Sequence, residues 1–340
     1  MDLKIKRILL SHLTHFIIQP FTIHFIGTKY PIYPMQKKKI RVLQLSDIHF
    51  DFSYTPGSLA NCKEPLCCQK PIRFNDSSQI PAGYWGSPFS CDIPYWTVKE
   101  MFNHIRRTEN DNFDYVLFAG DLMRHQDWTY TKQGHLALIE NFTALLIEYF
   151  PNTPVLWTIG NHEGVPINKG SYSVQLSDGL RFISLNNGYC ETTNFWMYLN
   201  QTDPDGALSW LVQELLRAEK DQNYVYILGH IPPGNADCLE SWTRNYYKII
   251  NRFSNTIKAQ FFGHVHVDIF TVFYENMDDS TSKPTAVLYS APSVTTFKDL
   301  NPAYRIYEIE NGSQYFYFFL SIYRERMVHN SIFRHQYNEK

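Results

Sequence analysis

Five apolar segments of this chain end in aspartate, asparagine or histidine, and this repeated ending constrains the fold more than any other feature. The five endings are Ser46-Asp47-Ile48-His49, Gly120-Asp121, Gly160-Asn161-His162-Glu163, Gly229-His230 and Gly263-His264-Val265-His266. In open α/β sheets, ligands bind beyond the carboxyl ends of the strands. If each apolar segment is a strand of this kind, side chains between residues 47 and 266 can converge on one place.

The rest of the chain supports such strands. Short β-rich runs alternate with helical periodicity from residue 40 onward, which favours stacked βαβ units over an all-β sandwich. Strands are expected over residues 41–45, 115–119, 155–159, 180–185, 224–228, 259–262, 286–289 and 305–309. Helices are expected over residues 95–107, 135–149, 207–220 and 241–257. With 44% apolar residues the chain can build a real core, and we expect one large α/β domain over residues 40–311.

The five endings together supply two aspartates, one asparagine and four histidines that can bind metal ions. These candidate ligands are Asp47, His49, Asp121, Asn161, His230, His264 and His266. Two metal ions need about four protein ligands each. Seven groups supply eight metal–ligand bonds if one carboxylate bridges the two ions. Any one of these pieces is more often a turn or a surface histidine. The complete ordered set predicts a two-metal centre.

Local spacing favours the same interpretation. Asp47 and His49 are separated by one residue, as are His264 and His266, so on extended backbone both members of a pair face the same side. Glycines precede four of the candidate ligand positions and allow tight turns and close backbone approach. These glycines are Gly120, Gly160, Gly229 and Gly263.

Charge and histidine content restrict the partners of the protein. The 31 Lys and Arg residues against 33 Asp and Glu residues give a net charge of −2, so the chain lacks the basic excess that nucleic acids require. Nucleic acid is therefore not expected as a partner. Protonation of the thirteen histidines in an acidic compartment would make the chain positive and favour peripheral contact with anionic membranes.

Cysteine and asparagine patterns indicate an oxidising compartment. Six cysteines allow fifteen disulfide pairings, between which the sequence alone does not choose. Four Asn-x-Ser/Thr glycosylation acceptors occur, at Asn75, Asn141, Asn200 and Asn311. Together these features predict a secreted or lysosomal protein.

Three segments stand apart from the α/β pattern. Residues 1–39 are interpreted as a degraded signal-like segment and linker, because basic residues precede an apolar stretch over 8–27 that polar residues interrupt. Residues 51–94 form a long segment that contains proline, glycine and cysteine residues, and we expect disulfide bonds of these cysteines to hold it together. Residues 312–340 form an atypical tail. Its aromatic run over 315–320 is an edge strand, an aggregation-prone stretch or sequence foreign to the natural protein.

The ordered set of endings is the pattern of the calcineurin-like metallophosphatases, and further segments resemble the acid sphingomyelinases. These segments are Cys62-Lys63-Glu64-Pro65-Leu66-Cys67-Cys68, Gly83-Tyr84-Trp85-Gly86, Asn194-Phe195-Trp196, His230-Ile231-Pro232-Pro233-Gly234, residues 242–247 and residues 259–268. The similarity covers roughly residues 41–310. It implies a metallophosphatase-type β-sandwich core flanked by helices in four α/β/β/α layers, with residues 40–311 as the metallophosphoesterase domain.

The resemblance also implies roles for single residues. One zinc ion would be held by Asp47, His49, Asp121 and His266, and a second by Asp121, Asn161, His230 and His264, so that Asp121 bridges. The family's disulfides correspond to Cys62 with Cys67, Cys68 with Cys91 and Cys190 with Cys238. His125 and His162 match family histidines near the scissile phosphate and are the acid–base candidates.

By this resemblance the chain is expected to be a zinc-dependent phosphodiesterase that hydrolyses sphingomyelin to ceramide and phosphocholine. Two dications can bind the oxygens of an anionic diester, lower the pKa of a shared water and clamp an in-line displacement. A related phosphodiesterase acting on nucleotides or other small diesters is the enzymatic alternative. A truncated relic that binds metal without turnover is the non-catalytic alternative.

Three departures from the family bear on these alternatives. No saposin-like lipid-extracting module precedes residue 40, and the tail replaces the family's C-terminal helical region. The chain is also shorter between Asn161 and Cys190. These differences are expected either of a truncated or mispredicted gene product or of a genuine short paralogue.

Overall fold

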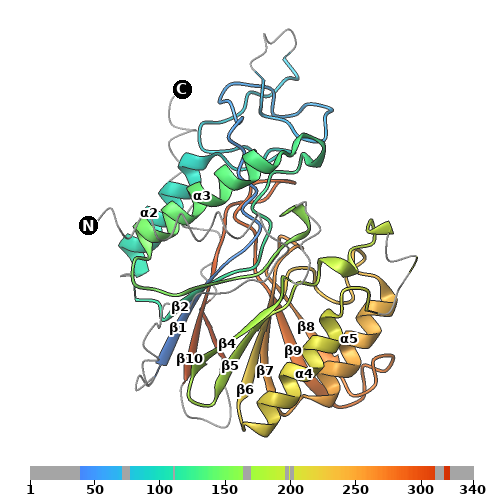
Figure 1. Ribbon diagram of the computed structural model, residues 1–340. Helices are drawn as coiled ribbons and strands as arrows, with labels where there is room; N and C mark the ends of the chain where they lie inside the picture. Colours follow the sequence, from blue (N-terminus) through green and yellow to red (C-terminus); the bar gives the residue numbers. More distant parts are fainter. Residues whose placement is uncertain are drawn as a thin grey trace.

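The structure is a computed structural model that describes residues 39–70, 77–109, 112–163, 170–195, 199, 203–310 and 318–321. The signal-like segment expected over residues 1–39 lies outside the described residues except for Lys39. The expected tail lies outside them except for residues 318–321. The described chain forms two β-sheets packed face to face, with a pair of helices on each outer side (Figure 1).

The first sheet has the strand order β11-β10-β1-β2-β3. Its strands β1 (Lys39–Leu45), β2 (Tyr115–Phe118) and β3 (Val155–Trp157) run parallel to one another. Strand β10 (Arg305–Glu310) is antiparallel to β1, and β11 (Phe318–Ser321) is antiparallel to β10 at the sheet edge. The described residues of the aromatic run expected over 315–320 therefore lie in an edge strand.

The second sheet has the strand order β4-β5-β6-β7-β9-β8. Four parallel strands form its centre: β5 (Leu180–Ser184), β6 (Tyr224–Leu228), β7 (Ile257–Phe262) and β9 (Pro284–Ser290). Strands β4 (Tyr172–Ser177) and β8 (Ile269–Tyr274) pair antiparallel at its two edges.

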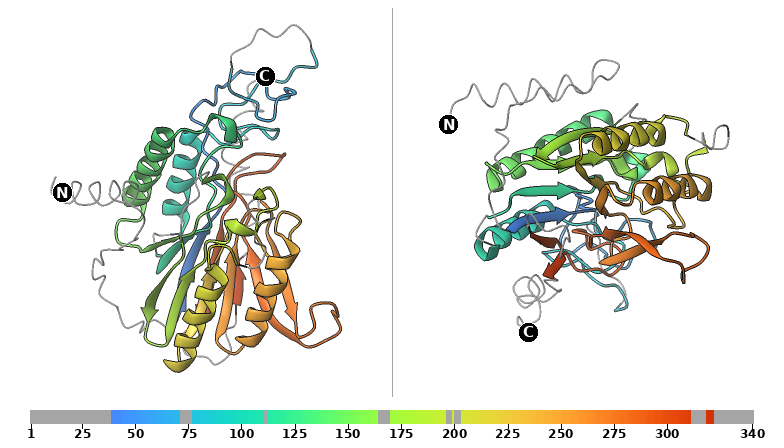
Figure 2. Two further views of the ribbon diagram at one scale, coloured as in Figure 1. Left: turned by 45° about the vertical axis from the view of Figure 1, so that its right-hand side comes forward. Right: turned by 90° about the horizontal axis from the view of Figure 1, so that it is seen from below.

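Helices α2 (Tyr95–Glu109) and α3 (Lys132–Tyr149) cover the outer face of the first sheet, and α4 (Ala207–Lys220) and α5 (Glu240–Arg252) cover the second (Figure 2). Short 3₁₀ helices lie in loops, among them η1 (Asp127–Thr129), η2 (Asn161–Glu163) and η3 (Gly188–Cys190). This is the four-layer α/β/β/α arrangement that the resemblance implied. Among the described residues, no helix combines the length and apolar character that crossing a bilayer requires.

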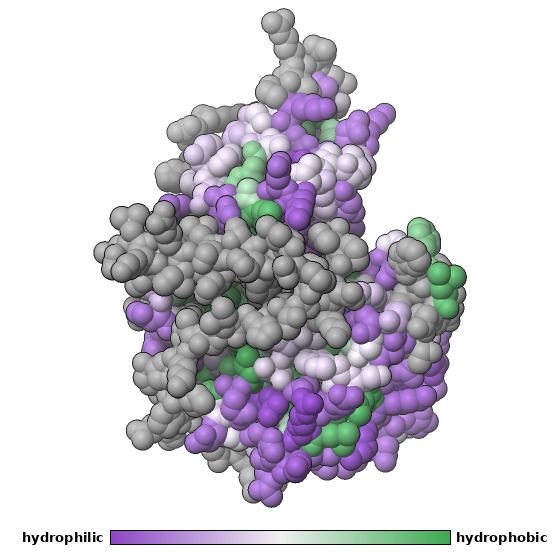
Figure 3. Space-filling view, viewed as in Figure 1, coloured by the Kyte–Doolittle hydropathy of each residue, from purple (hydrophilic) through white to green (hydrophobic). Residues whose placement is uncertain are grey.

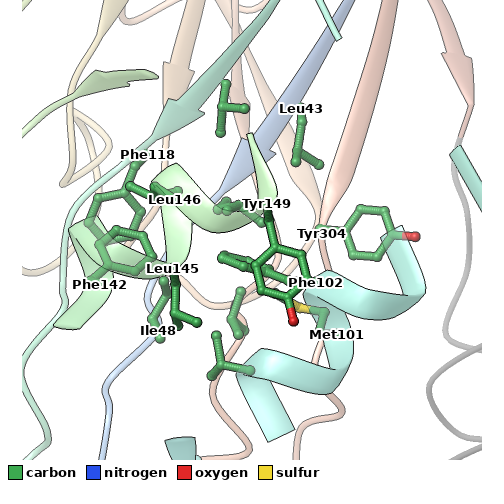
Figure 4. Packing of buried hydrophobic residues seen from close by; sticks show 14 of the residues in the cluster. Leu43, Ile48, Met101, Phe102, Phe118, Phe142, Leu145, Leu146, Tyr149 and Tyr304 are labelled. Carbon is green, nitrogen blue, oxygen red and sulfur yellow. The ribbon is translucent and has the colours of Figure 1, made fainter. Parts of the chain in front are cut away.

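The central strands are mostly apolar, because they are buried on both faces. Leu43 of β1 and Phe118 of β2 pack beneath the α2–α3 pair with Phe102 and Phe142 (Figure 4). Their neighbours Val42 and Leu117 point the opposite way, into the core between the sheets. Side chains alternate across a strand, so a parallel strand with two covered faces reads as a continuous apolar run.

The expected strands and helices are all present, with three differences. Strands β4 and β8 were not expected, because both are antiparallel edge strands outside the βαβ pattern. The helix expected over 241–257 ends at Arg252, and Ile257 begins β7. Finally, the βαβ units are divided between two facing sheets, which the pattern alone did not predict.

Three disulfide bonds join Cys62 to Cys67, Cys68 to Cys91, and Cys190 to Cys238, as the resemblance implied. The first two fasten the 51–94 segment, whose buried residues include Tyr54 and Ala60. Among the four glycosylation acceptors, Asn141 is exposed on α3 and the other three lie outside the described residues. On the described part of the surface in Figure 3, hydrophilic side chains predominate and apolar side chains form small patches.

Candidate metal centre

The loops that follow β1, β2, β3, β6 and β7 meet at the carboxyl ends of both sheets. Backbone hydrogen bonds tie these loops together: Asp47 N–H donates to Gly120 C=O (3.0 Å), and Gly263 N–H donates to His230 C=O (3.0 Å). Because three of the strands belong to the first sheet and two to the second, the site lies across the junction between the sheets. All seven candidate ligands lie in these loops.

The first group of donors consists of Asp47, His49 and His266, whose ligand atoms all lie within 4.8 Å of one another. Asp47 Oδ1 is 3.4 Å from His266 Nε2 and 3.9 Å from His49 Nε2. Asp47 and His49 are fully buried, and His266 is half-buried at the mouth of the site.

The second group consists of Asp121, His230 and His264, again within 4.8 Å of one another. Asn161 joins it, because its Oδ1 lies 2.9 Å from His230 Nε2 and 2.9 Å from His264 Nδ1. Asp121 connects the two groups. Its Oδ2 is 3.1 Å from His230 Nε2 in the second group and 3.5 Å from His49 Nε2 in the first.

Hydrogen bonds on the far side of each ring decide which nitrogen faces the centre. His49 Nδ1 donates to Met123 C=O (2.6 Å), and His230 Nδ1 donates to Ala119 C=O (2.6 Å). His264 Nε2 donates to the carboxylate of Asp237 (3.0 Å). Since a carbonyl or carboxylate oxygen only accepts, the opposite nitrogen of each neutral ring presents a lone pair to the centre.

The centre is therefore a cluster of acceptor atoms that face one another. Carboxylate oxygens of Asp47 and Asp121, the amide oxygen of Asn161 and imidazole lone pairs converge, and buried His49 Nε2 has no hydrogen-bond partner. Among the ion pairs of the described residues, those of Asp47 and Asp121 involve only histidines. Buried acceptors and charges in this arrangement need positive charge between them. This donor set fits two divalent cations.

The pKa shifts follow from the same crowding. Burial alone raises the pKa of Asp121, but His230 and His162 outweigh it and hold that pKa well below its usual value. Burial alone lowers the pKa of His230, but the carboxylate of Asp121 raises it to about 10. Burial and neighbouring His125 push the pKa of His49 well below its usual value. Burial also raises the pKa of Asp47, but His266 and His230 outweigh it and lower that pKa. Both carboxylates are thus ionised, and the cluster attracts a proton or a metal cation.

Five of the candidate ligands adopt left-handed backbone conformations, with φ of 51° at Asp47, 48° at His49, 60° at Asp121, 68° at His264 and 61° at His266. The extended backbone expected for the Asp47/His49 and His264/His266 pairs is therefore wrong. Asp47 and His49 still lie in one donor group, whereas His264 and His266 lie in different groups. Non-glycine residues rarely adopt positive φ, and such conformations cluster at functional sites.

The preceding glycines serve mainly close approach. A Cβ at Gly160 would lie 2.1 Å from Asp121 Oδ1, and one at Gly263 would lie 1.9 Å from Ser46 Oγ. Only Gly120 among the four adopts positive φ, at 92°. Any side chain at Gly160 or Gly263 would therefore displace the carboxylate-bearing loops.

The acid–base candidates His125 and His162 border the first donor group. With His49 they form a third cluster whose ring nitrogens lie within 4.8 Å of one another. His162 Nδ1 is 2.8 Å from Asp127 Oδ1, and its backbone N–H donates to Asp121 Oδ1 (2.8 Å). His125 Nδ1 is 2.8 Å from Asp92 Oδ1.

Besides Asp127, which binds His162, three further carboxylates support the site and were not predicted as site residues. Glu163 is buried and accepts backbone N–H groups of Asp121 (3.1 Å), Leu122 (2.6 Å) and Gly160, so it joins the loops after β2 and β3. Asp237 orients His264, and Asp92 binds His125. Glu163 directly follows the Asn161-His162 ending, which is the one signal the sequence offered; Asp92 and Asp237 carry none.

The chain is similar in sequence to several known proteins. The sequence matches the calcineurin-like phosphoesterase family over residues 40–268. It is 46% identical over 311 residues to Sphingomyelin phosphodiesterase 1 of Caenorhabditis elegans, covering 80% of this chain and 54% of that protein. It is 38% identical over 310 residues to Sphingomyelin phosphodiesterase of Homo sapiens, covering 80% of this chain and 48% of that protein.

The chain therefore spans about half the length of these curated relatives. Among solved structures, a dimetal phosphatase from Danio rerio superposes with a TM-score of 0.49 and 14% identity, covering 83% of this chain and 98% of that one.

Proposed function

Because the chain belongs to the calcineurin-like phosphoesterases, and within them to the acid sphingomyelinase family, we propose that it is a zinc-dependent phosphodiesterase that hydrolyses sphingomyelin to ceramide and phosphocholine. This membership confirms the resemblance drawn from the sequence. One observation carries the proposal: acceptor atoms from five loops converge with Asp121 Oδ2 between His49 and His230. Residues 40–311 are proposed as the catalytic domain.

The residues around the centre divide into two ligand sets. Asp47, His49, Asp121 and His266 would hold one zinc ion, and Asp121, Asn161, His230 and His264 would hold the other. Nitrogen and carboxylate ligands in fours suit zinc. When bound, two such ions supply Lewis-acid stabilisation of the diester oxygens and an activated water. The protein's own contribution is to aim these donors inward, because backbone carbonyls accept from Nδ1 of His49 and His230 and leave Nε2 facing the centre.

Proton transfer is assigned to His162 and His125. Hydrolysis of sphingomyelin leaves ceramide with an alkoxide oxygen that must gain a proton. Each of the two imidazoles has its Nδ1 hydrogen-bonded to a carboxylate, Asp127 for His162 and Asp92 for His125, which leaves Nε2 to exchange the proton. Their position beside His49 keeps them at the edge of the first donor group.

Peripheral contact with a membrane is part of the proposal. Its support is a set of exposed apolar side chains: Trp128 (66% exposed), Phe195 (74%) and Leu199 (80%). Trp128 directly follows Asp127 in the sequence, and the Asp127 carboxylate binds His162 Nδ1. A secreted or lysosomal location is proposed as well, supported by three disulfide bonds and the exposed acceptor Asn141.

The proposal is tested by comparing purified, zinc-loaded protein on sphingomyelin micelles and on a nucleotide phosphodiester. We expect phosphocholine release from sphingomyelin and about two zinc ions per chain by elemental analysis. Turnover of the nucleotide diester alone would assign the chain to another substrate class. Two bound zinc ions without turnover of either substrate would leave the non-catalytic alternative.

A further inference from the structure

Asp92 is a buried carboxylate that belongs to neither ligand set. It lies between Cys91 and helix α2, at the end of the long segment fastened by disulfides, and its exposed fraction is 0%. The Cys68–Cys91 bond and the hydrogen bond from the Thr296 hydroxyl to Cys91 C=O (2.8 Å) hold its backbone in place. Burying a carboxylate is unfavourable unless its oxygens are satisfied.

Three donors converge on the two oxygens of Asp92. Its Oδ2 accepts the backbone N–H of His125 (2.7 Å), and its Oδ1 accepts both His125 Nδ1–H (2.8 Å) and the Thr295 hydroxyl (2.9 Å). The carboxylate thus accepts hydrogen bonds from both the backbone and the ring of His125. An ionised carboxylate only accepts hydrogen bonds, so a neutral His125 carries its proton on Nδ1 and a lone pair on Nε2.

Ring stacking removes the remaining freedom of His125. Its ring lies between Phe297, with centroids 3.8 Å apart and planes at 9°, and His49, with centroids 3.8 Å apart and planes at 28°. Rotation about the Cβ–Cγ bond would break the hydrogen bond to Asp92 and drive the ring into one of these neighbours. The imidazole therefore has one orientation and one neutral tautomer.

We propose that Asp92 is a positioning residue that fixes the tautomer and orientation of His125, so that Nε2 exchanges the proton during diester hydrolysis. This inference rests on the proposed function, because it supposes that His125 faces the substrate. It also gives the disulfide-fastened 51–94 segment a role, since this segment places Asp92 beneath the loop that follows β2.

An Asp92→Asn variant separates positioning from simple packing because the amide has the same shape but only one acceptor oxygen. The backbone N–H of His125 cannot change its direction, so the amide oxygen should remain with it. The amide NH₂ then faces Nδ1 of His125, which must become an acceptor. The neutral ring is therefore expected to move its proton to Nε2, which is the wrong tautomer for accepting a proton there.

The test uses zinc-loaded protein with ¹⁵N-labelled histidine, observed by NMR at a pH high enough that the His125 signals no longer change with pH. The His125 signals are identified by their loss in His125→Gln. We expect protonated Nδ1 in the wild type and protonated Nε2 in Asp92→Asn. On sphingomyelin micelles, kcat of Asp92→Asn should fall about a hundredfold to ten-thousandfold, with KM within about threefold. Zinc content should not change.

Thr295→Val is the matched control, because it removes one donor to Asp92 and leaves the bond between Asp92 and His125. It should keep the wild-type tautomer and kcat within about threefold. A wild-type His125 protonated on Nε2 overturns the inference without any variant. So does an Asp92→Asn tautomer equal to the wild type's, or a reversed tautomer with unchanged kcat. If wild-type protein hydrolyses no diester, the proposed function fails, while the tautomer comparison still decides whether Asp92 positions His125.

Discussion

Five residues of the centre have positive φ values, and their backbone conformations are therefore strained. Each such conformation at a non-glycine residue costs about 1–3 kcal/mol and persists only where the surroundings over-determine it. Here the surroundings are backbone contacts between neighbouring loops, such as Val294 N–H to Ser46 C=O (3.0 Å) and Thr295 N–H to Asp47 C=O (3.0 Å). These backbone contacts hold the donors in place, which is the pre-organisation that a metal site needs.

Variants at two histidines should separate metal binding from proton transfer. His264→Ala removes a donor whose Nδ1 faces Asn161, so it should lose about one zinc ion per chain together with turnover. His162→Ala leaves both ligand sets intact, so it should keep its zinc while kcat falls about a hundredfold to ten-thousandfold. Elemental analysis beside the sphingomyelin assay checks both. Unchanged activity in His162→Ala would remove His162 from the acid–base role.

Glu163 should matter for zinc affinity although it is outside both ligand sets. In Glu163→Gln the amide NH₂ would face a backbone N–H of Asp121, Leu122 or Gly160, and an unsatisfied buried donor costs about 1–3 kcal/mol. Loss of this brace should lower both the melting temperature and the zinc affinity, by about tenfold to a hundredfold for the latter. Competition with a zinc chelator measures the affinity.

Glu214→Gln is the matched control for this prediction. Glu214 is equally buried, but it accepts from Ser173 (2.6 Å) and Arg181 (3.1 Å), away from the centre. It should lower the melting temperature and leave zinc affinity unchanged. Equal zinc affinities in the two variants would contradict a bracing role for Glu163.

The sequence could predict the donors of the site but not the residues that orient them. Asp47, Asp121 and His230 follow apolar strands directly, so the strand pattern marks them. Asp92 and Asp237 lie in irregular loops, and their importance depends on which imidazole they face in space. The left-handed backbone conformations were not predictable either, because aspartate and histidine can adopt them but adopt other conformations as well.

Elements were predictable where burial on two faces left a continuous apolar run, as in β2 and β6. Edge strands have weaker sequence patterns than buried parallel strands. Strand β4 alternates apolar and polar side chains, and β8 exposes Ile269 and Phe270, so neither belongs to the buried parallel pattern. The end of α5 was missed because Ile257 continues the helical periodicity while belonging to the next strand. Assigning strands to two sheets depends on long-range packing, which only the family resemblance supplied.

The start of α4 should show a pH-dependent stability. Burial, together with the nearby Asp203 carboxylate, raises the pKa of Asp205 to about 6, although Ala207 N–H partly stabilises its charge. A raised pKa means that the folded state binds the proton more tightly than the unfolded state. The contribution of Asp205 to stability is therefore most favourable below the unfolded pKa of about 4 and is lost as pH rises through about 6.

Asp205→Asn should remove this dependence. We expect the variant to melt at a higher temperature than the wild type at pH 7.5 and at the same temperature near pH 4, as followed by circular dichroism. Asp221→Asn, at the exposed opposite end of α4, serves as the comparison. An equal effect of Asp205→Asn at both pH values would show that its carboxyl group is not perturbed by folding.

At the scale of the whole molecule, the metal centre joins the two sheets. The first sheet contributes Asp47, His49, Asp121 and Asn161, and the second contributes His230, His264 and His266. Each proposed ion has ligands from both sheets. Ions bound in this way would hold together the layers whose contact forms the central core, so metal binding should stabilise the fold as well as supply the chemistry.

Removal of zinc should therefore lower the melting temperature of the entire α/β/β/α domain. A ligand at a thousand times its Kd stabilises the native state by about 4 kcal/mol, and in a domain of this size about 1 kcal/mol corresponds to roughly 2–4 °C. Chelator-treated protein should melt roughly 8–16 °C below the zinc-loaded form and recover when zinc is restored. In His264→Ala the shift should be smaller, because one ligand set is incomplete. A melting temperature that does not respond to the chelator in protein shown to have lost its zinc would mean that packing between the sheets, and not the ions, holds the five loops in place.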